Sequence, residues 1–183
     1  MAKIGVFFAE GYEEIEALTT VDLCRRAGIE VLMVATDNAA SVTGSHGICV
    51  SMDIALSDVD FDSLDMLVLP GGKSGTENLE HCSALMEQLD RFYESGRWIA
   101  AICAAPSIFG HRMYLEGKRA TSYPSFTEHL KGARVTHSPA VSDGNVITGR
   151  GMGASIAFGL LIVEKLISGQ AADELAKTIV YER

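Results

Sequence analysis

Cys103 is the residue best placed for chemistry in this sequence. It lies in the segment WIAAICAAP, residues 98–106, where an apolar run predicts a buried strand and Pro106 favours the first turn of a helix. At such a corner, exposed N–H groups and the helix dipole stabilise an anion. We therefore predict a lowered thiol pKa and a nucleophilic thiolate at neutral pH. A buried structural cysteine fits the same spacing equally well.

Two further segments carry candidate site groups. The run LVLPGG, residues 67–72, predicts a strand that ends in a glycine pair, and glycines there allow backbone N–H groups to face an oxyanion. On its own this pattern also describes an ordinary turn. The segment AEGYEEIE places Glu13, Glu14 and Glu16 after the first apolar run. Glu13 and Glu14 suit a helix N-terminus, whose dipole favours acidic residues.

Glu16 differs from these two acids because the periodicity of Ile15, Leu18 and Val21 turns it partly toward the predicted sheet. A buried carboxyl has a raised pKa and can donate a hydrogen bond or a proton to a neighbouring thiolate. The alternative is one more solvated acid in the first helical turn.

The elements that must position these groups alternate between strands and helices. This alternation is typical of a mostly parallel sheet with helices on both faces, an α/β fold. The predicted strands are Ile4–Phe8, Val31–Ala35, Ser45–Val50, Met66–Leu69, Trp98–Ile102 and Val146–Thr148. The predicted helices are Glu13–Ala27, Leu79–Ser95, Ala105–Met113 and Ala154–Ile167. The polar segment Tyr114–Ser142 predicts loops and short helices.

Composition limits the classes of function. A chain of 183 residues, 48% of them hydrophobic and undivided by linkers or repeats, predicts a single domain spanning residues 1–183. A net charge of -9 opposes nucleic acid or an anionic membrane as the main partner. Without a signal-like start or a long apolar run, a cytoplasmic protein is expected. The four cysteines show no metal-type spacing, so we expect free thiols, no metal and no cofactor.

Several motifs in order resemble one known family. They are GYEEIE, VDLCRRAGIEV, LVLPGG, AAICAAP and GRGMGASIAFG, and the resemblance runs from Ile4 to about Glu164. Together they are similar to the ThiJ/PfpI superfamily, and within it to the branch of the parkinsonism-associated protein deglycase. That resemblance implies a flavodoxin-like three-layer sandwich in which the nucleophile occupies a sharp strand-to-helix turn, the nucleophile elbow.

The resemblance also implies roles for single residues. Cys103 matches the family nucleophile and Glu16 the acid that contacts its sulfur. Backbone N–H groups of Gly72 and Ala104 would form the oxyanion hole, and Gly71, His46 and Tyr123 are candidates for binding substrate or lining its pocket. A homodimer is implied, whose surface involves the first helix and the hairpin region Val42–Asp53. Candidate interface residues are Arg26 and Asp53.

The sequence departs from the family at one position beside the nucleophile. Relatives credited with deglycase or glyoxalase activity often carry a histidine there, whereas this chain has Tyr123, a poor base at neutral pH because phenols ionise near pH 10. His46, which falls where some relatives carry an arginine near the site, is the one replacement to consider. We interpret His111 as a packed core histidine. His81, His129 and His137 are interpreted as surface residues.

Two functions remain open at this stage. One is a cysteine-dependent glyoxalase or deglycase acting on 2-oxoaldehydes or their adducts, with Cys103 as nucleophile and Glu16 moving protons. The other is a stress module without turnover, either chaperone-like or a redox sensor in which Cys103 is oxidised and Glu16 holds the product. The partner would be a reactive carbonyl or an oxidant. An intracellular peptidase or amidase is disfavoured, because Ala104 stands where such relatives have histidine.

Overall fold

A seven-stranded mixed sheet forms the centre of the computed structural model, which describes residues 1–182. Its strand order is β10-β11-β7-β6-β1-β2-β5, and every neighbouring pair is parallel except β10 with β11. The strands are β1 (Lys3–Phe8), β2 (Glu30–Ala35), β5 (Ile54–Ala55), β6 (Met66–Leu69), β7 (Trp98–Ile102), β10 (Ala140–Asp143) and β11 (Val146–Gly149). The mostly parallel sheet predicted from the sequence is confirmed.

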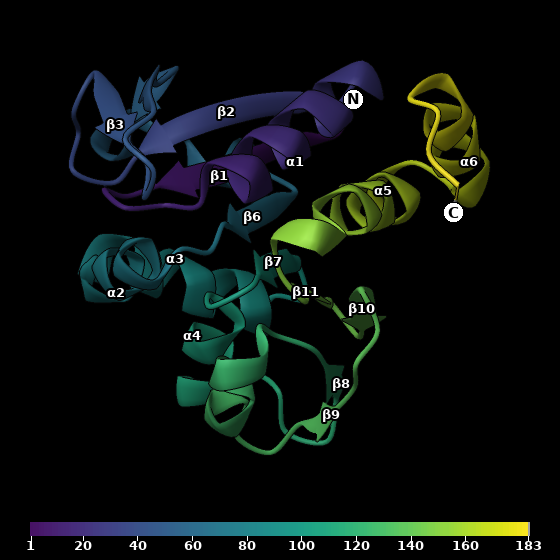
Figure 1. Cartoon of the computed structure of the whole chain (residues 1–183). Helices are drawn as coiled ribbons and strands as arrows, with labels where there is room; N and C mark the ends of the chain where they lie inside the picture. The colour runs from purple at the N-terminus through teal and green to yellow at the C-terminus, as the bar shows by residue number, and fades with distance from the viewer. Residues whose placement is uncertain (183) are drawn as a thin grey trace.

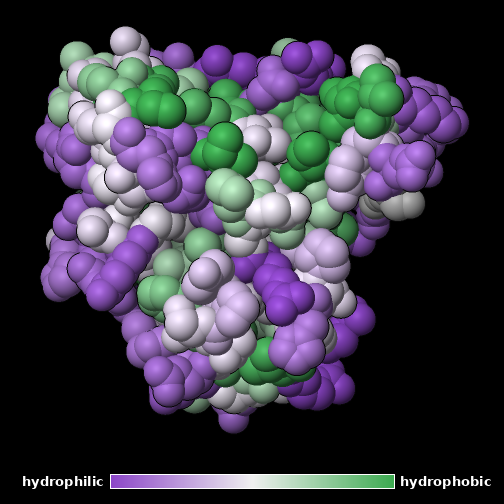
Figure 2. All heavy atoms as spheres, in the orientation of Figure 1, coloured by the Kyte–Doolittle hydropathy of each residue, from purple (hydrophilic) through white to green (hydrophobic). Residues whose placement is uncertain are grey.

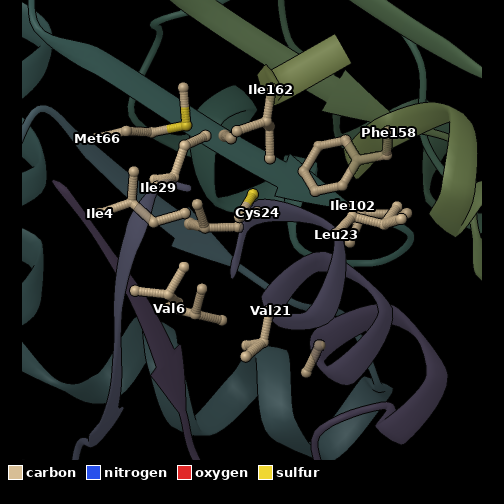
Figure 3. Close-up of a cluster of buried hydrophobic side chains, with 14 of the residues drawn as sticks. Ile4, Val6, Val21, Leu23, Cys24, Ile29, Met66, Ile102, Phe158 and Ile162 are labelled. Atoms are coloured by element: carbon tan, nitrogen blue, oxygen red, sulfur yellow. The ribbon is translucent and has the colours of Figure 1, made fainter. Parts of the chain in front are cut away.

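Helices cover both faces of this sheet, which gives three layers (Figure 1). They are α1 (Glu14–Arg26), α2 (Lys73–His81), α3 (Ser83–Glu94), α4 (Pro106–His111), α5 (Ser155–Leu166) and α6 (Gly169–Thr178). Because successive side chains of a strand point to opposite faces, β1 serves two cores. Ile4 and Val6 pack in the cluster that contains Phe158 of α5 (Figure 3), whereas Phe7 packs in the cluster that contains Phe92 of α3.

Short elements complete the fold. An antiparallel hairpin joins β3 (Ser41–Thr43) to β4 (Cys49–Ser51), and a parallel pair joins β8 (Arg119–Ala120) to β9 (Arg134–Val135). The 3-10 helices are η1 (Leu56–Asp58), η2 (Phe61–Ser63), η3 (Pro124–His129) and η4 (Met152–Ala154). The segment predicted as loops and short helices therefore holds β8, η3 and β9 and reaches into β10. Among residues 1–182 no helix combines the length and the apolar character needed to cross a membrane.

Two sequence predictions need correction, and one helix was missed. The strand predicted over residues 45–50 is wrong at its start and right only at Cys49 and Val50, which lie in β4, because residues 44–48 form the hairpin turn, in which the Gly44 N–H donates to the Ile48 carbonyl at 3.0 Å. The single helix predicted over residues 79–95 is wrong as well. It is two helices, α2 and α3, separated at Cys82, whose φ of -80° and ψ of 90° are extended. Helix α6 was not predicted.

The order of the strands decides where a site can form. Strands β7, β6 and β1 are neighbours and run parallel, so their carboxyl ends lie at one edge of the sheet. The segments that follow these ends carry Cys103, the Gly71–Gly72 pair and Glu16, respectively. This edge therefore brings together the three groups that the sequence singled out, as expected for ligand sites in open α/β sheets.

Candidate active site

Cys103 occupies a strained backbone position at the end of β7. Its φ is 65°, in the left-handed region that side chains other than glycine rarely adopt. The Cys103 N–H donates to the Gly149 carbonyl at 3.0 Å, and the Cys103 carbonyl accepts from the Tyr123 N–H at 2.8 Å. Bonds to two separate segments therefore fix this conformation, and the strand-to-helix corner predicted from the sequence is confirmed.

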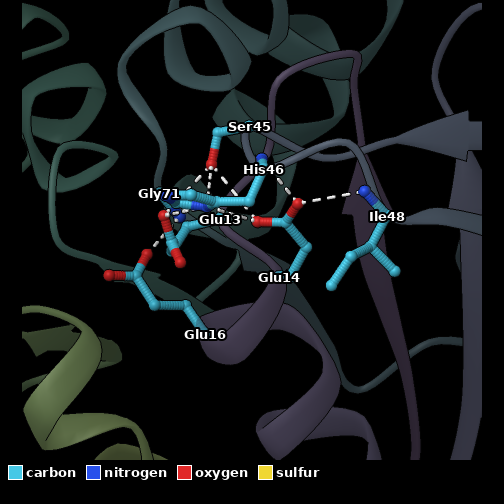
Figure 4. Close-up of polar contacts among 7 residues, drawn as sticks. All are labelled: Glu13, Glu14, Glu16, Ser45, His46, Ile48 and Gly71. Atoms are coloured by element: carbon cyan, nitrogen blue, oxygen red, sulfur yellow. Dashed lines mark hydrogen bonds and ion pairs between the residues drawn. The ribbon is translucent and has the colours of Figure 1, made fainter.

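Glu16 reaches the sulfur from the first turn of α1. Its side chain is fully buried, its Oε2 accepts a hydrogen bond from the Gly71 N–H at 2.9 Å (Figure 4), and its carboxyl hydrogen-bonds to the Cys103 thiol. Gly71 leaves no spare room between them. A Cβ on residue 71 would lie 2.4 Å from the Glu16 Oε2 and 2.6 Å from the Cys103 Cβ. The carboxyl and the thiol thus meet only because residue 71 lacks a side chain.

Two backbone N–H groups, those of Gly72 and Ala104, donate to the sulfur of Cys103. Gly72 has a φ of 88°, and a Cβ on it would lie 2.4 Å from the Gly11 carbonyl oxygen. Glycine is therefore required here by both conformation and space. The structure brings together the four residues expected at the centre of the site: Cys103, Glu16, Gly72 and Ala104.

The carboxyl and the thiol titrate as a coupled pair. Burial raises the pKa of Glu16 to about 7, against the opposing effect of its hydrogen bonds to Cys103 and Gly71. Burial also raises the pKa of the Cys103 thiol, the Glu16 carboxylate raises it further, and the two backbone N–H groups lower it. The lowered thiol pKa predicted from the sequence is thus wrong, because that argument counted the helix terminus and omitted burial and the adjacent acid. The first proton leaves the pair near pH 7.

Glu14 holds the hairpin turn against α1. It is almost fully buried and accepts hydrogen bonds from the His46 N–H at 2.7 Å and the Ser45 hydroxyl at 3.2 Å (Figure 4). Burial alone would raise the pKa of Glu14, but the bonds from His46 and Ile48 lower it to about 2. Ligand atoms of Glu13, Glu14 and His46 all lie within 4.8 Å of one another, so these residues could hold a cation.

A second group of predicted residues lies at the rim of the site. The ring of His46 stands 3.0 Å from Glu14, and this bond raises the pKa of His46, whose side chain is mostly exposed. Tyr123 is half exposed and faces Gly151, where a Cβ would lie 3.3 Å from the tyrosine ring and 4.0 Å from the Cys103 sulfur. Tyr123, Gly151 and Arg150 line a cavity of about 510 Å³.

Comparison with known proteins identifies the family. The family model described as DJ-1/PfpI matches residues 2–165. The chain belongs to the DJ-1/PfpI family. It is 37% identical over 180 residues to protein DJ-1 homolog B of Arabidopsis thaliana, covering 97% of this chain and 41% of the relative. It is 31% identical over 150 residues to a deglycase of Pyrococcus abyssi, covering 81% of this chain and 89% of the relative.

Solved structures of the DJ-1/PfpI family share the whole fold. Oxidized DJ-1 of Toxoplasma gondii superposes with a TM-score of 0.95 at 30% identity, over 100% of both chains. The flavodoxin-like fold class inferred from the sequence is confirmed. The chain spans less than half of two plant relatives, 41% of DJ-1 homolog B and 45% of DJ-1 homolog A of Arabidopsis thaliana.

Some residues of this DJ-1/PfpI chain have surroundings that sequence reasoning missed. Glu14 was interpreted as a partner of the helix dipole, and no spacing signal links it to a turn more than 30 positions away. His111 is not a packed core histidine. It is exposed at the end of α4 and its Nδ1 lies 2.7 Å from Glu80. Arg26 pairs with Asp22 at 2.6 Å, and Asp53 with Arg25 at 2.6 Å.

Proposed function

We propose that this DJ-1/PfpI chain is a stress-protective enzyme of the glyoxalase or deglycase type, in which Cys103 adds to 2-oxoaldehydes or to their adducts on amines and thiols. One observation carries the proposal. The Cys103 sulfur lies between a buried carboxyl whose pKa is about 7 and two backbone N–H donors. Addition to a carbonyl requires a nucleophile, a proton acceptor and an oxyanion site, and all three lie around the Cys103 sulfur.

In the first step Cys103 adds to the aldehyde carbon of a substrate such as methylglyoxal. The sulfur–carbon bond forms while the thiol proton passes to the Glu16 carboxylate. The carbonyl oxygen becomes an oxyanion, which the N–H groups of Gly72 and Ala104 stabilise in the buried site. Taking the proton back from Glu16 gives a neutral hemithioacetal, so charge and protons balance.

In the second step Glu16 moves a proton between neighbouring carbons. It removes the hydrogen from the carbon bonded to sulfur, and the resulting enediol is reprotonated on the adjacent carbon. The product is a thioester of a 2-hydroxy acid. Water then cleaves the sulfur–carbon bond, releases lactate and restores the Cys103 thiol. The chain needs no cofactor for this sequence of steps, and Tyr123 would close the pocket rather than act as a base.

The comparisons and the surface support this assignment. The Pyrococcus abyssi relative is named a deglycase and is matched over most of its length. We place the protein in the cytoplasm as a homodimer, with Arg26 and Asp53 at the interface. Apolar side chains on α1 and the hairpin favour this dimer, because Ile15 is 52% and Ile48 is 53% exposed, and Figure 2 shows apolar spheres over this part of the molecule. A monomer in sedimentation equilibrium would contradict it.

Lactate formation from methylglyoxal tests the proposal. The wild-type protein is expected to produce lactate above the buffer rate, and Cys103→Ala to produce none, because the nucleophile is absent. Cys82→Ala is the matched control, since Cys82 is a free thiol at the break between α2 and α3, away from the proposed interface. Equal rates of lactate formation in the wild type and Cys103→Ala would contradict the proposal.

Oxidation of Cys103 is a second candidate function with an observation of its own. Within residues 1–182, the Glu16 Oε1 is buried without a hydrogen-bond partner. Two equivalents of peroxide convert a thiol to a sulfinic acid and release two waters, and a protonated Glu16 can donate to the sulfinate oxygen. Intact-mass analysis during peroxide titration is expected to show a gain of about 32 Da on Cys103 first. Equal oxidation of Cys49 and Cys82 at that stage would rule out a selective sensor.

A further inference from the structure

A second cluster of chemically active side chains lies away from Cys103, where α2, α4 and η3 meet. The Nδ1 of His111 lies 2.7 Å from the Glu80 carboxylate, and its Nε2 lies 3.1 Å from the Nδ1 of His129. The two rings are nearly perpendicular, with 5.2 Å between their centroids. Neither the proposed reaction nor the family motifs use these residues.

The hydrogen bonds dictate which nitrogen is free. The Glu80 carboxylate can only accept, so the His111 Nδ1 carries a proton and donates it. The Nε2 of the neutral His111 ring therefore has a lone pair, directed at His129. A carboxylate that fixes a histidine through its other ring nitrogen is the usual surrounding of a metal-binding histidine.

We propose that His111 Nε2 and His129 Nδ1 bind a divalent transition metal ion, with Zn²⁺ as the reference ion, in place of the proton between them. Metal–nitrogen bonds of about 2.0–2.1 Å would span their 3.1 Å separation with an N–metal–N angle of about 100°, close to the tetrahedral value. Binding moves the His129 proton from Nδ1 to Nε2, which frees the Nδ1 lone pair for the ion; both rings stay neutral and no net proton is released.

The backbone holds the two segments that carry these rings close together. Gly110 precedes His111, and a Cβ on residue 110 would lie 1.9 Å from the His129 carbonyl oxygen. Only glycine lets η3 approach α4 this closely. Because the two histidines extend from neighbouring backbone segments, their rings need only turn about the side-chain bonds to aim both lone pairs at one ion, which reduces the ordering cost of metal binding.

The surrounding cavity suits a cation with further ligands. It has a volume of about 410 Å³ and is lined by the histidines, by Glu77 and Glu80 and by one cation, Lys73. Thr76 also lines it, and its buried Oγ1 has no hydrogen-bond partner within residues 1–182. Water has room to complete the coordination shell, and the net charge of -9 favours an approaching cation.

Each element that reaches this cluster begins beside the candidate active site. Helix α2 follows Gly72, α4 begins two residues after Ala104, and η3 follows Tyr123. An ion bound by His111 and His129 would therefore link the C-terminal ends of α4 and η3, two segments that begin beside Cys103.

Zinc binding by the full chain tests the proposal. Equilibrium dialysis against micromolar Zn²⁺ at pH 7.5 is expected to show a bound ion that His111→Gln and His129→Gln each lose. Glu80→Gln is expected to weaken zinc binding by about 10- to 100-fold, because it removes the carboxylate charge that raises the basicity of His111. His81→Gln is the matched control, since His81 is an exposed histidine that faces the Glu77 carbonyl.

Two results would overturn the metal site. Unchanged zinc stoichiometry and affinity in His111→Gln and His129→Gln would show that the pair is only a hydrogen bond. Loss of the ion in His46→Gln alone would assign it to the group formed by Glu13, Glu14 and His46. Circular dichroism of each metal-free variant checks folding, and where a histidine variant is unfolded, an unchanged affinity in Glu80→Gln decides against the site.

Discussion

Glu16→Gln is expected to slow alkylation of Cys103 by iodoacetamide about a hundredfold at pH 7. In the wild-type protein, the first proton leaves the buried pair near pH 7 because burial raises the pKa of Glu16 to about 7. Glutamine preserves the shape of the side chain but cannot accept that proton. The thiol must then ionise without that base. Loss of the carboxylate lowers the pKa of the thiol, but burial, the largest cause of its shift, still holds that pKa above the ordinary value.

The pH profile of alkylation separates this role from a structural one. The wild-type rate is expected to rise through a midpoint near pH 7, and the Glu16→Gln rate through a midpoint at least one unit higher. Cys82, a free thiol outside the proposed interface, serves as the internal reference in both proteins. Identical midpoints for Cys103 in the two proteins would remove Glu16 from the chemistry.

The same substitution is expected to have the opposite effect on stability. Between pH 4.5 and pH 7 the folded wild type binds the Glu16 proton more tightly than the unfolded chain does, so rising pH favours unfolding. The raised pKa of Glu16 contributes about 3 kcal/mol to the free energy of unfolding at pH 4, and this contribution is lost once the pH exceeds 7. In Glu16→Gln the side chain at this position does not titrate, so it adds no such pH dependence. In urea unfolding, the free energy of unfolding of Glu16→Gln relative to that of the wild type is therefore expected to rise by about 3 kcal/mol between pH 4 and pH 8.

Gly71→Ala is expected to separate Cys103 from Glu16 without changing either residue. The added Cβ would lie 2.4 Å from the Glu16 Oε2, 2.6 Å from the Cys103 Cβ and 2.9 Å from the Ile102 carbonyl oxygen. Since all three are closer than real contacts allow, the carboxyl must move. We expect the free energy of unfolding to fall by about 2–3 kcal/mol. We also expect alkylation of Cys103 to slow by at least tenfold, toward the rate expected for Glu16→Gln.

Gly169→Ala provides the matched control for this glycine substitution. A Cβ at the start of α6 would meet nothing within 4 Å. The free energy of unfolding is expected to change by less than about 1 kcal/mol, and the alkylation rate to stay that of the wild type. A Gly71→Ala protein as stable and reactive as Gly169→Ala would contradict the close approach of Cys103 and Glu16.

The centre of the candidate site could be predicted because its residues follow strand ends. Strands are visible as apolar runs, and parallel strands place the residues after their ends at one edge, so Cys103, Glu16 and Gly72 converge without knowledge of any distance. The sign of the Cys103 pKa shift could not be predicted. It depends on how deeply the thiol is buried and on the charge of its neighbour, which no local pattern records.

Contacts between distant segments explain the other misses. Glu14 bonds to the hairpin turn and His111 to Glu80 across 31 or more positions, and both residues look unremarkable within their own segments. The break between α2 and α3 lies at Cys82, a residue with no helix-stopping character, so the helical pattern runs across it. The hairpin register follows from the turn around Gly47, whose φ is 79°.

The backbone of Cys103 predicts how residue 103 responds to substitution. A left-handed conformation costs a side chain about 1 kcal/mol that glycine does not incur, and the bonds to Gly149 and Tyr123 impose that conformation on residue 103. Cys103→Gly therefore removes the thiol and relieves the backbone strain at the same time, so part of the stability lost with the side-chain packing is recovered.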